Sequence, residues 1–573
     1  MSGPVGAEPE PNDLVPRGAG SPLIPRIGLA VAVAALALLV REVAFYVDDA
    51  FITFRYARNW SEWGTPLFNS FELKDGLERA EGYSNFLWMA LLRVLHGAGL
   101  DLVAVTPFVQ LGLGVATLIL LLRSARGDLE LGPVGAVAAP LVLATAAPFV
   151  CWTTGGMETG LFTLLLTSLF LGANSEANRP RAIGVSVAAA LVTLVRVEGL
   201  AWVLGSALAI GAATLVARKA VAEKATIVRR RLVIAVAAGL AAFAIQLIYR
   251  RAVYGHWVPT TVTAKTGGGG TEVIERGLRQ VASWGLVTLT PIFAVLLAPM
   301  ALRHRSPGAR FAALAGLGVT VGFVAYNAAT GGDWMPFFRF LAPVTPLLAL
   351  LIATGLDRLP SAAGWGCLVA VLATQPLALF DIHVAPESTR EALRFRSFKG
   401  GYRSERARID TARLNTDYFG QLGKGLAAHT EPGEVLAFGA IGSPGWYAKD
   451  LDFLDRNGLV TPIVARREVE RGEGTAGHEK RVPHAFFLDQ GEPQPKWLFA
   501  KVVPALIGDP GQPSLAQAKA LIRQDGIVGK KPERALFERT VLRTVPMREG
   551  PAAGWTLLLL ERAEPEAANA FWR

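Results

Sequence analysis

The feature that most constrains this chain is a series of long apolar runs that contain no charged residue. Four of them are Leu102–Leu122, Pro133–Met157, Gly199–Ala217 and Leu232–Tyr249. Only about 20 such residues are needed to carry a helix across the hydrocarbon core of a bilayer. Hydrophobic residues make up 51% of the 573 residues and charged residues 18%, and the mean hydropathy is +0.36. Together these values predict a polytopic α-helical membrane protein.

The apolar pattern predicts about 11 membrane spans. They are expected at 25–46, 103–123, 133–151, 159–174, 181–195, 199–217, 232–250, 284–302, 310–328, 338–356 and 361–380. Residues 1–24 are rich in Pro, Gly and Glu and are predicted to form a disordered cytoplasmic tail. The first apolar run is too long for a secretory signal and precedes no small-x-small cleavage site, so a retained anchor is expected.

The connecting loops alternate in charge, and this alternation predicts which side of the membrane each one faces. Arginine and lysine cluster in every second loop, which marks those loops and the amino terminus as cytoplasmic. The net charge of +10 therefore reflects topology rather than nucleic-acid binding. Residues 84–100 are apolar but contain Arg93 and His96, and an interfacial helix on the outer face fits them better than a span. Cys151 and Cys367 both lie in apolar stretches, so no disulfide is expected.

The composition changes at about residue 384, where charges return and short apolar runs alternate with turn residues. Strands are predicted at Glu434–Ile441, Lys496–Val503 and Trp555–Leu560, with a helix at Ser514–Gln524. The expected organisation is a membrane domain at 25–383 followed by a soluble α/β domain at 384–573. The loop parity places this second domain on the outer face.

A paired acid, Asp48-Asp49, stands where the first span should emerge into water, and Arg55 and Tyr56 follow about two helical turns later. A hydrophilic flank that fixes the span is one interpretation. Ionisable groups held at a membrane face also mark chemistry or ion handling.

Every outer loop adds carboxylates or cations beside glycines, whereas the inner loops carry mainly arginine and lysine. Taken singly, an Arg–Glu pair can anchor a membrane edge, a Gly-Gly-Asp can be a turn, and tryptophans form interfacial belts. Their convergence on one face predicts a site for an anionic, lipid-borne substrate. The candidate donor-phosphate and substrate-binding residues are Arg55, Tyr56, Glu81, Tyr83, Glu158, Arg196, Glu198, His256, Lys265, Asp333 and Arg339.

Glycosyl transfer from a polyprenyl-phosphate sugar is a chemistry that would use this set. A surface carboxylate could take the proton of the acceptor hydroxyl as general base. Arg196, Lys265 or Arg339 could bind the departing phosphate. Asp49 could orient the acceptor or hold a divalent cation such as Mg²⁺, Mn²⁺ or Ca²⁺. No nucleotide-binding pattern is visible, and an outer-face site has no access to nucleotide sugars, so a lipid-linked donor is expected.

These motifs resemble those of the GT-C fold glycosyltransferases, over most of residues 40–345. Within that superfamily the chain is similar to the mycobacterial-type terminal arabinofuranosyltransferase family, which takes arabinofuranose from decaprenyl-phosphoryl-arabinose. The motifs that carry the resemblance are Asp48-Asp49-Ala50-Phe51-Ile52, Glu81-Gly82-Tyr83-Ser84-Asn85, Gly155-Gly156-Met157-Glu158-Thr159, Arg196-Val197-Glu198-Gly199 and Gly331-Gly332-Asp333-Trp334-Met335.

The resemblance implies an inverting glycosyltransferase of a bacterial inner (plasma) membrane that acts in cell-wall biogenesis. Asp48 matches the catalytic base of the superfamily and Asp49 its acidic neighbour. Glu81, Glu158, Glu198 and Asp333 are expected to line the cavity for sugar hydroxyls or a metal. The chain departs from the family pattern at Asn85-Phe86, where Ser-Pro is expected, and at Val197, where proline is expected. Neither departure removes a reactive group.

Other functions remain open at the level of sequence. The same fold could use another polyprenyl-phosphate sugar such as mannose, with a glycan, lipid or protein as acceptor. A transporter or flippase for lipid-linked sugars would favour charges inside the spans and inverted repeats, whereas here the charges lie in outer loops. A structural or receptor-like protein that binds cell-wall glycan would not explain the paired acid.

Overall fold

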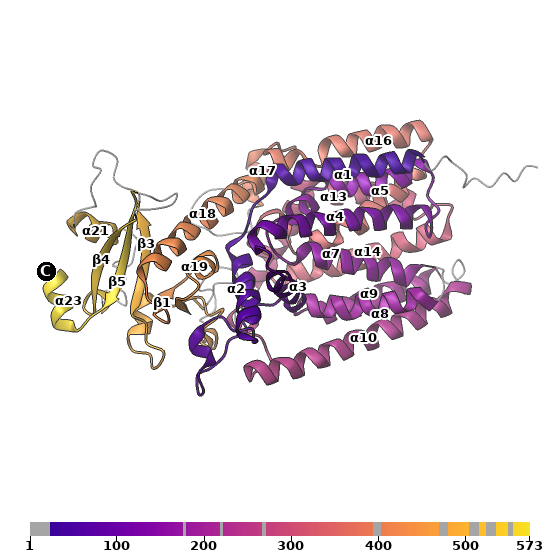
Figure 1. Cartoon of the computed structure of the whole chain (residues 1–573). Helices are drawn as coiled ribbons and strands as arrows, with labels where there is room; N and C mark the ends of the chain where they lie inside the picture. The colour runs from indigo at the N-terminus through magenta and orange to yellow at the C-terminus, as the bar shows by residue number, and fades with distance from the viewer. Residues whose placement is uncertain are drawn as a thin grey trace, which may run out of the picture.

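The computed structural model of the protein describes residues 23–175, 179–217, 222–265, 271–393, 403–468, 480–503, 515–522, 535–547 and 554–572. A bundle of long helices occupies one end of the molecule and a smaller α/β domain the other, with α2 and α3 between them (Figure 1). The predicted disordered tail falls outside the described residues except for its last two.

Apolar helices dominate the bundle because a chain in lipid must satisfy its backbone hydrogen bonds internally. The bundle helices are α1 Leu23–Val43, α4 Leu102–Arg126, α5 Pro133–Thr145, α6 Ala147–Trp152, α7 Thr159–Asn174, α8 Arg179–Val195, α9 Gly199–Val216, α10 Ala222–Tyr254, α12 Thr271–Thr288, α13 Thr290–Ala301, α14 Pro307–Ala329, α15 Thr345–Asp357 and α16 Ser361–Thr374. Short elements between them are α2 Asp48–Trp63, η1 Ser70–Leu73, α3 Phe86–Gly97, α11 Thr260–Lys265, η2 Pro336–Phe338, η3 Ala342–Val344, η4 Leu377–Phe380 and α17 Glu387–Ala392.

The prediction of a multi-pass membrane protein is confirmed. Among the described residues, six helices are long and apolar enough to cross a membrane, or seven if α12 and α13 count as one bent span. Every predicted span has a corresponding helix, but several of these helices have 10–17 residues. The count of about 11 spans therefore stays a prediction, as does the assignment of the outer face.

Three predicted spans differ in detail from the structure. The span expected at 284–302 is instead two helices bent by 81°, with Leu289 between them at φ 57°. Pro291 lacks the N–H that would continue a helix through this point. The span at 133–151 breaks at Ala146, and the span at 338–356 opens with two 3₁₀ turns before α15.

The centre of the bundle is occupied by α15, in which every residue from Thr345 to Leu356 is buried. Nearby, α9 and α14 pack through Trp202 and Phe323, whose rings stack with centroids 3.5 Å apart. Such a buried apolar centre gives the outer loops a rigid base on which polar side chains can be positioned.

A five-stranded sheet with order β2-β1-β3-β5-β4 forms the core of the second domain. β1 is parallel to β2, with Val435 opposite Asp452, and parallel to β3. β5 is antiparallel to both β3 and β4. The strands are β1 Val435–Phe438, β2 Asp452–Asp455, β3 Trp497–Val503, β4 Thr540–Pro546 and β5 Thr556–Arg562.

The three predicted strands correspond to β1, β3 and β5, so the α/β prediction for this domain is confirmed. The helix expected at 514–524 is α21 Leu515–Ile522, and the ends of that prediction lie outside the described residues. The sequence analysis did not predict β2, β4, α19 Gly442–Tyr447, α20 Pro462–Ala465, η5 His484–Leu488, α23 Pro565–Trp572 or the long helix α18 Glu405–His429.

α18 connects the two parts of the molecule (Figure 1). Near its middle, Thr416 Oγ1 donates to the carbonyl of Tyr46 at 2.9 Å. Tyr418 Oη donates to the carbonyl of Val502 in β3 at 3.2 Å. The helix thus fixes the sheet to the segment that leads into the paired acid.

Candidate active site

The paired acid forms the first turn of α2. Asp48 and Asp49 follow Val47, whose extended backbone donates its N–H to the carbonyl of Gly155 at 3.3 Å. Carboxylates are favoured at this end of a helix because its free N–H groups carry partial positive charge. Both side chains are half-buried. The helix therefore begins where the sequence changes from apolar to acidic.

Asp48 binds the outer domain directly. Its Oδ1 accepts from the N–H of Ser443 at 2.8 Å and its Oδ2 from the N–H of Gly442 at 3.1 Å. These two N–H groups open α19. A side chain at position 442 would place its Cβ only 1.9 Å from the carbonyl oxygen of Asp48. Glycine is therefore required for this approach.

The two acids differ in their surroundings. No hydrogen bond to the carboxylate of Asp49 is found within the described part of the chain, whereas both oxygens of Asp48 accept one. Burial raises the pKa of Asp48 to about 6, and the charge of Asp49 adds to this rise while the N–H groups of Ser443 and Gly442 oppose it. Asp48 thus has the proton affinity of a base that works near neutral pH.

Asp455, at the end of β2, is a third acid in this region. It is fully buried, and its oxygens accept from the N–H groups of Asn457 at 2.8 Å and Leu459 at 2.6 Å. Burial raises the pKa of Asp455 to about 7, with a further contribution from Asp49. The outer domain therefore adds a carboxyl group beside the acids of α2.

Cations and carboxylates from three other loops meet around Phe340. The guanidinium groups of Arg196 and Arg339 lie 5.4 Å and 5.1 Å from the centre of its ring. Arg196 pairs with Glu158 and Glu198, at 2.6 Å in each case. Arg339 Nε donates to Asp333 Oδ2 at 2.8 Å. These six residues are called the arginine cluster below.

Glu158 and Asp333 are the buried carboxylates of the arginine cluster. Burial of Glu158 favours protonation, but Arg196 and Arg339 outweigh that effect and hold the pKa of Glu158 below its ordinary value. The two arginines therefore keep the Glu158 carboxylate charged.

Asn85 connects the arginine cluster to the helix that carries the paired acid. Its Nδ2 donates to Glu158 Oε2 at 3.1 Å and to Thr53 Oγ1 at 3.2 Å. Thr53 lies one turn along α2 from Asp49, on the same face. One side chain therefore joins the arginine cluster to α2. The sequence analysis named Asn85 within a motif of the resemblance and as a departure from the family pattern, but not as a site residue.

Two predicted substrate-binding residues bond to other parts of the protein. Arg55 is fully buried and donates to the carbonyls of Phe68, Gly445 and Leu451 at 2.7–2.8 Å, and to that of Ala448 at 3.3 Å. These bonds tie α2 to the first loop and to the outer domain. Binding of the donor by Arg55 stays a prediction.

Tyr56 is likewise buried, and its hydroxyl is held within the first outer loop. It donates to the carbonyl of Ala80 at 2.7 Å and accepts from the N–H of Gly82 at 2.8 Å. The role of Tyr56 in substrate binding also stays a prediction.

Glu81 and Tyr83 pack against the outer end of α10. Glu81 forms an ion pair with Arg250, and both side chains are almost fully buried. The hydroxyl of Tyr83 lies 3.0 Å from that of Tyr254. The sequence analysis missed Arg250, which ends a predicted span. The pair Arg250-Arg251 at the end of an apolar run was the available signal.

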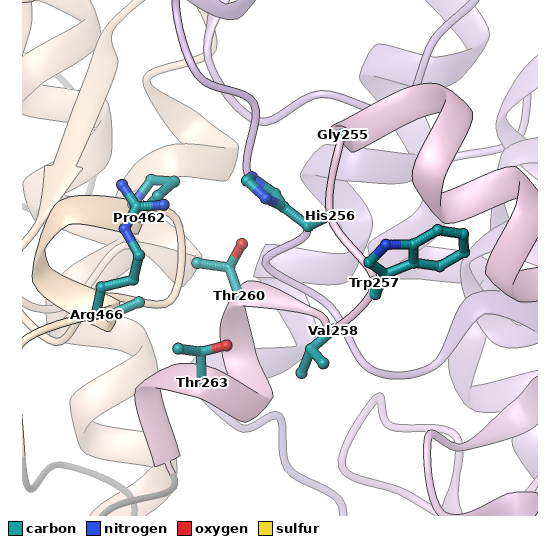
Figure 2. Close-up of a pocket in the computed structure, with 9 residues that line it drawn as sticks. Gly255, His256, Trp257, Val258, Thr260, Thr263, Pro462 and Arg466 are labelled. Atoms are coloured by element: carbon teal, nitrogen blue, oxygen red, sulfur yellow. The ribbon is translucent and has the colours of Figure 1, made fainter.

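His256 and Lys265 lie apart from the arginine cluster. His256 lines a pocket of about 310 Å³ between the segment after α10 and the outer domain (Figure 2). Lys265 is exposed at the end of α11, next to residues outside the described ranges. The structure thus brings together Glu158, Arg196, Glu198, Asp333 and Arg339, but not these two residues.

No group of three or more His, Cys, Asp or Glu side chains suited to a metal ion occurs in the described ranges. Within those ranges Asp49 therefore has at most one such neighbour with which to share a metal ion. The divalent cation expected at Asp49 stays a prediction, and its remaining ligands would have to come from substrate or water.

Comparison with known proteins identifies the fold. ArnT from Cupriavidus metallidurans, bound to undecaprenyl phosphate, superposes with a TM-score of 0.55 at 12% identity, covering 94% of this chain and 98% of that one. Apo ArnT gives 0.53 at 14% identity, covering 93% and 98%. The chain therefore has the GT-C fold that the sequence motifs led us to expect.

Other comparisons are more limited. The structure of the arabinofuranosyltransferase AftD from mycobacteria gives a TM-score of 0.49 at 16% identity, covering 94% of this chain and 40% of that one. A family model described as a domain of unknown function (DUF8728) matches residues 403–527. No curated protein matches the chain.

Proposed function

We propose that this protein is a membrane glycosyltransferase that moves a sugar from a polyprenyl-phosphate donor to a glycan of the cell envelope. The observation that carries the proposal is the link from Thr53, on the helix that begins with the paired acid, through Asn85 to the arginine cluster. The fold shared with ArnT, a structure of which contains undecaprenyl phosphate, supports the choice of donor.

The arginine cluster is suited to the donor phosphate. Guanidinium groups bind phosphate oxygens through paired N–H donors. Arg339 donates a hydrogen bond from Nε to Asp333. In our proposal its two terminal guanidinium nitrogens, which make no hydrogen bond among the described residues, bind the phosphate. Arg196 is held more tightly between Glu158 and Glu198. Arg339 is therefore the primary phosphate ligand in our proposal, with Arg196 supporting it.

The paired acid is suited to activating the acceptor. In the proposed reaction, Asp48 takes the proton of the acceptor hydroxyl, and the hydroxyl oxygen forms a bond to the anomeric carbon of the donor sugar. The bond from that carbon to the phosphate breaks, and the electron pair leaves with the polyprenyl phosphate. The arginine cluster stabilises the charge that develops there. A single displacement of this kind inverts the anomeric centre.

Asp48 and Asp49 have separate tasks in this mechanism. Each oxygen of Asp48 accepts one N–H and retains a lone pair for the acceptor proton. Asp49, with no hydrogen bond to its carboxylate in the described residues, would orient the acceptor or bind a divalent ion. Arabinofuranose is the proposed sugar on the strength of the motif resemblance, with mannose as the alternative.

The decisive experiment measures transfer from radiolabelled polyprenyl-phosphate arabinose and mannose by the purified full-length protein. We expect Asp48→Asn to lower the rate by about 10²–10⁴-fold, the usual contribution of a general base. Asp489→Asn, which changes an exposed carboxylate of the outer domain, serves as the matched control.

An unchanged rate in Asp48→Asn would contradict its role as base. Consumption of neither donor by the unaltered protein would contradict the transferase proposal. Movement of an intact labelled donor across vesicles containing the protein, without transfer, would favour the transporter alternative.

A further inference from the structure

The pocket near His256 lies at the junction of the bundle and the outer domain. Its walls come from Gly255–Val258, Thr260 and Thr263 on one side and from Pro462, Ala465 and Arg466 on the other. Figure 2 shows Pro462 and Arg466 facing His256, Thr260 and Thr263, with Trp257 and Val258 on the side away from Arg466. At about 310 Å³ it is at the lower limit of ligand pockets, which suits a short piece of a larger ligand.

The lining combines apolar walls with a few polar groups. Pro462, Ala465 and Val258 offer C–H surface, while Thr260 and Thr263 contribute hydroxyl groups. Trp257 is 59% exposed. A sugar ring has the matching combination, because its C–H faces pack on apolar or aromatic surface and its hydroxyls hydrogen-bond at its edge.

An ion pair at the pocket offers both a donor and an acceptor to a sugar. Arg466 pairs with Glu78, with Nη2 donating to Oε2 at 2.6 Å. His256 Nε2 lies 3.1 Å from Oε1 of the same carboxylate. The hydrogen bond from Arg466 holds the pKa of Glu78 below its ordinary value, so this carboxylate is charged near neutral pH. Sugar hydroxyls can donate to Glu78 and accept from Arg466.

Two segments of the chain connect the pocket to the candidate active site. On the bundle side, the N–H of Glu81 donates to Thr260 Oγ1 at 3.1 Å. On the domain side, the segment 455–466 begins at Asp455, whose pKa is affected by Asp49, and ends at the pocket with Arg466. The walls of the pocket are therefore joined through short segments to Glu81 on one side and to Asp455 on the other.

We propose that the pocket is a remote subsite that binds neutral sugar units of the glycan acceptor, some distance along the chain from the hydroxyl that reacts. This inference rests on the proposed transferase function. It gives His256 a role in acceptor binding and assigns Glu78 and Arg466 to the same task.

The test measures binding without turnover, on the full-length protein in detergent. Arabinofuranose and mannose oligosaccharides, from disaccharide to octasaccharide, are titrated in the absence of donor. We expect Arg466→Ala to weaken octasaccharide binding about tenfold, the loss typical of a hydrogen bond to a charged group, and to affect the disaccharide less. The matched control is Arg543→Ala, which removes an exposed arginine that pairs with Glu561 elsewhere in the outer domain. The control should bind both oligosaccharides as the unaltered protein does.

Three results would overturn the proposal. The first is unchanged octasaccharide binding in Arg466→Ala, and the second is an equal loss in Arg543→Ala. The third is an Arg466→Ala variant that binds polyprenyl phosphate more weakly but binds the octasaccharide normally. The last result would assign the pocket to the donor lipid. If the octasaccharide binds through Arg466 but no donor is ever consumed, the transferase proposal fails while glycan binding stands.

Discussion

At the scale of single residues, the structure separates two neighbours that look alike in the sequence. Asp48 is bound by two N–H groups of the outer domain, and Asp49 is not. The difference arises because successive residues of a helix point about 100° apart. Only one of the pair can therefore face α19, and no local pattern in the sequence reveals which.

The pH dependence of transfer should report the protonation of Asp48. Its pKa is raised to about 6, so the carboxylate that acts as base is lost as the pH falls through this value. We expect the single-turnover rate to decline about tenfold per pH unit below about 6. Asp49 raises this pKa, so the residual rate of Asp49→Asn should decline at a lower pH than that of the unaltered protein. A decline that moves to higher pH would contradict this interpretation.

The same shift has the opposite effect on stability. Because burial raises the folded-state pKa of Asp48 above its value in the unfolded chain, the folded protein binds the proton more tightly. The contribution to stability is fully present below about pH 4 and is lost as the pH rises through about 6. Activity therefore requires the less stable protonation state of this side chain.

A second residue-scale prediction concerns the donor phosphate. Arg339→Lys keeps a positive charge but loses the planar fork that binds two phosphate oxygens. We expect the KM for the lipid donor to rise about tenfold, since one charge-assisted hydrogen bond is lost. Arg358→Lys, an exposed arginine after α15, is the control. A similar change in both variants would show that the effect is not specific to the cluster.

At the scale of elements, long apolar helices were predictable and their interruptions were not. The bend between α12 and α13 depends on Leu289 in a left-handed conformation, which tertiary packing imposes. The four residues of β2 read Asp-Phe-Leu-Asp, and so short a run gives no clear period of two. α18 is amphipathic with a weakly apolar face, so its pattern does not distinguish it from a solvated segment.

The site was predictable as a set of loops, but the contacts within it were not. Acidic and basic residues beside glycines in the predicted outer loops indicated that Glu158, Arg196, Asp333 and Arg339 belong to one site. Arg55 carried the same signal, yet it binds backbone carbonyls from the outer domain nearly 400 positions away. Only the folded chain shows that this arginine is fully buried among those carbonyls.

The contact between α2 and α19 can be tested at the element scale. Gly442→Ala would place a methyl group within 1.9 Å of the Asp48 carbonyl, so the two helices must separate. We expect about 1–3 kcal/mol of destabilisation from overpacking, a lower thermal unfolding midpoint and reduced transfer. Gly491→Ala, whose Cβ would meet no atom within 4 Å, should leave both measurements unchanged. Normal stability and activity in Gly442→Ala would show that the contact is unimportant.

At the scale of the whole molecule, the proposal requires that the paired acid, the arginine cluster and the outer domain face the same side of the membrane. α10 has 33 residues and is therefore about 50 Å long at 1.5 Å per residue. A bilayer core measures about 30 Å, so α10 extends beyond it. Its outer end, at Arg250 and Tyr254, contacts the loop that contains Glu81.

Cysteine labelling tests this arrangement directly. In a Cys367→Ala background, Lys449→Cys lies exposed in the outer domain and Arg303→Cys lies exposed in a loop predicted to be cytoplasmic. The remaining Cys151 is fully buried. We expect an impermeant reagent added outside intact cells to label position 449 and not position 303. The reverse result would invert the topology and remove the site from the outer leaflet.

The close approach at Gly442 also bears on how such a protein can be recombined. The family match begins at residue 403, which invites the exchange of the outer domain as a cassette. Yet Gly442 of that domain packs against the backbone of α2, the helix that begins with the paired acid. Arg55 of the same helix donates to carbonyls of that domain. A transplanted domain would bring a donor sequence evolved against a different partner. Chimeras should therefore take residues 442–452 and α2 from the same parent protein.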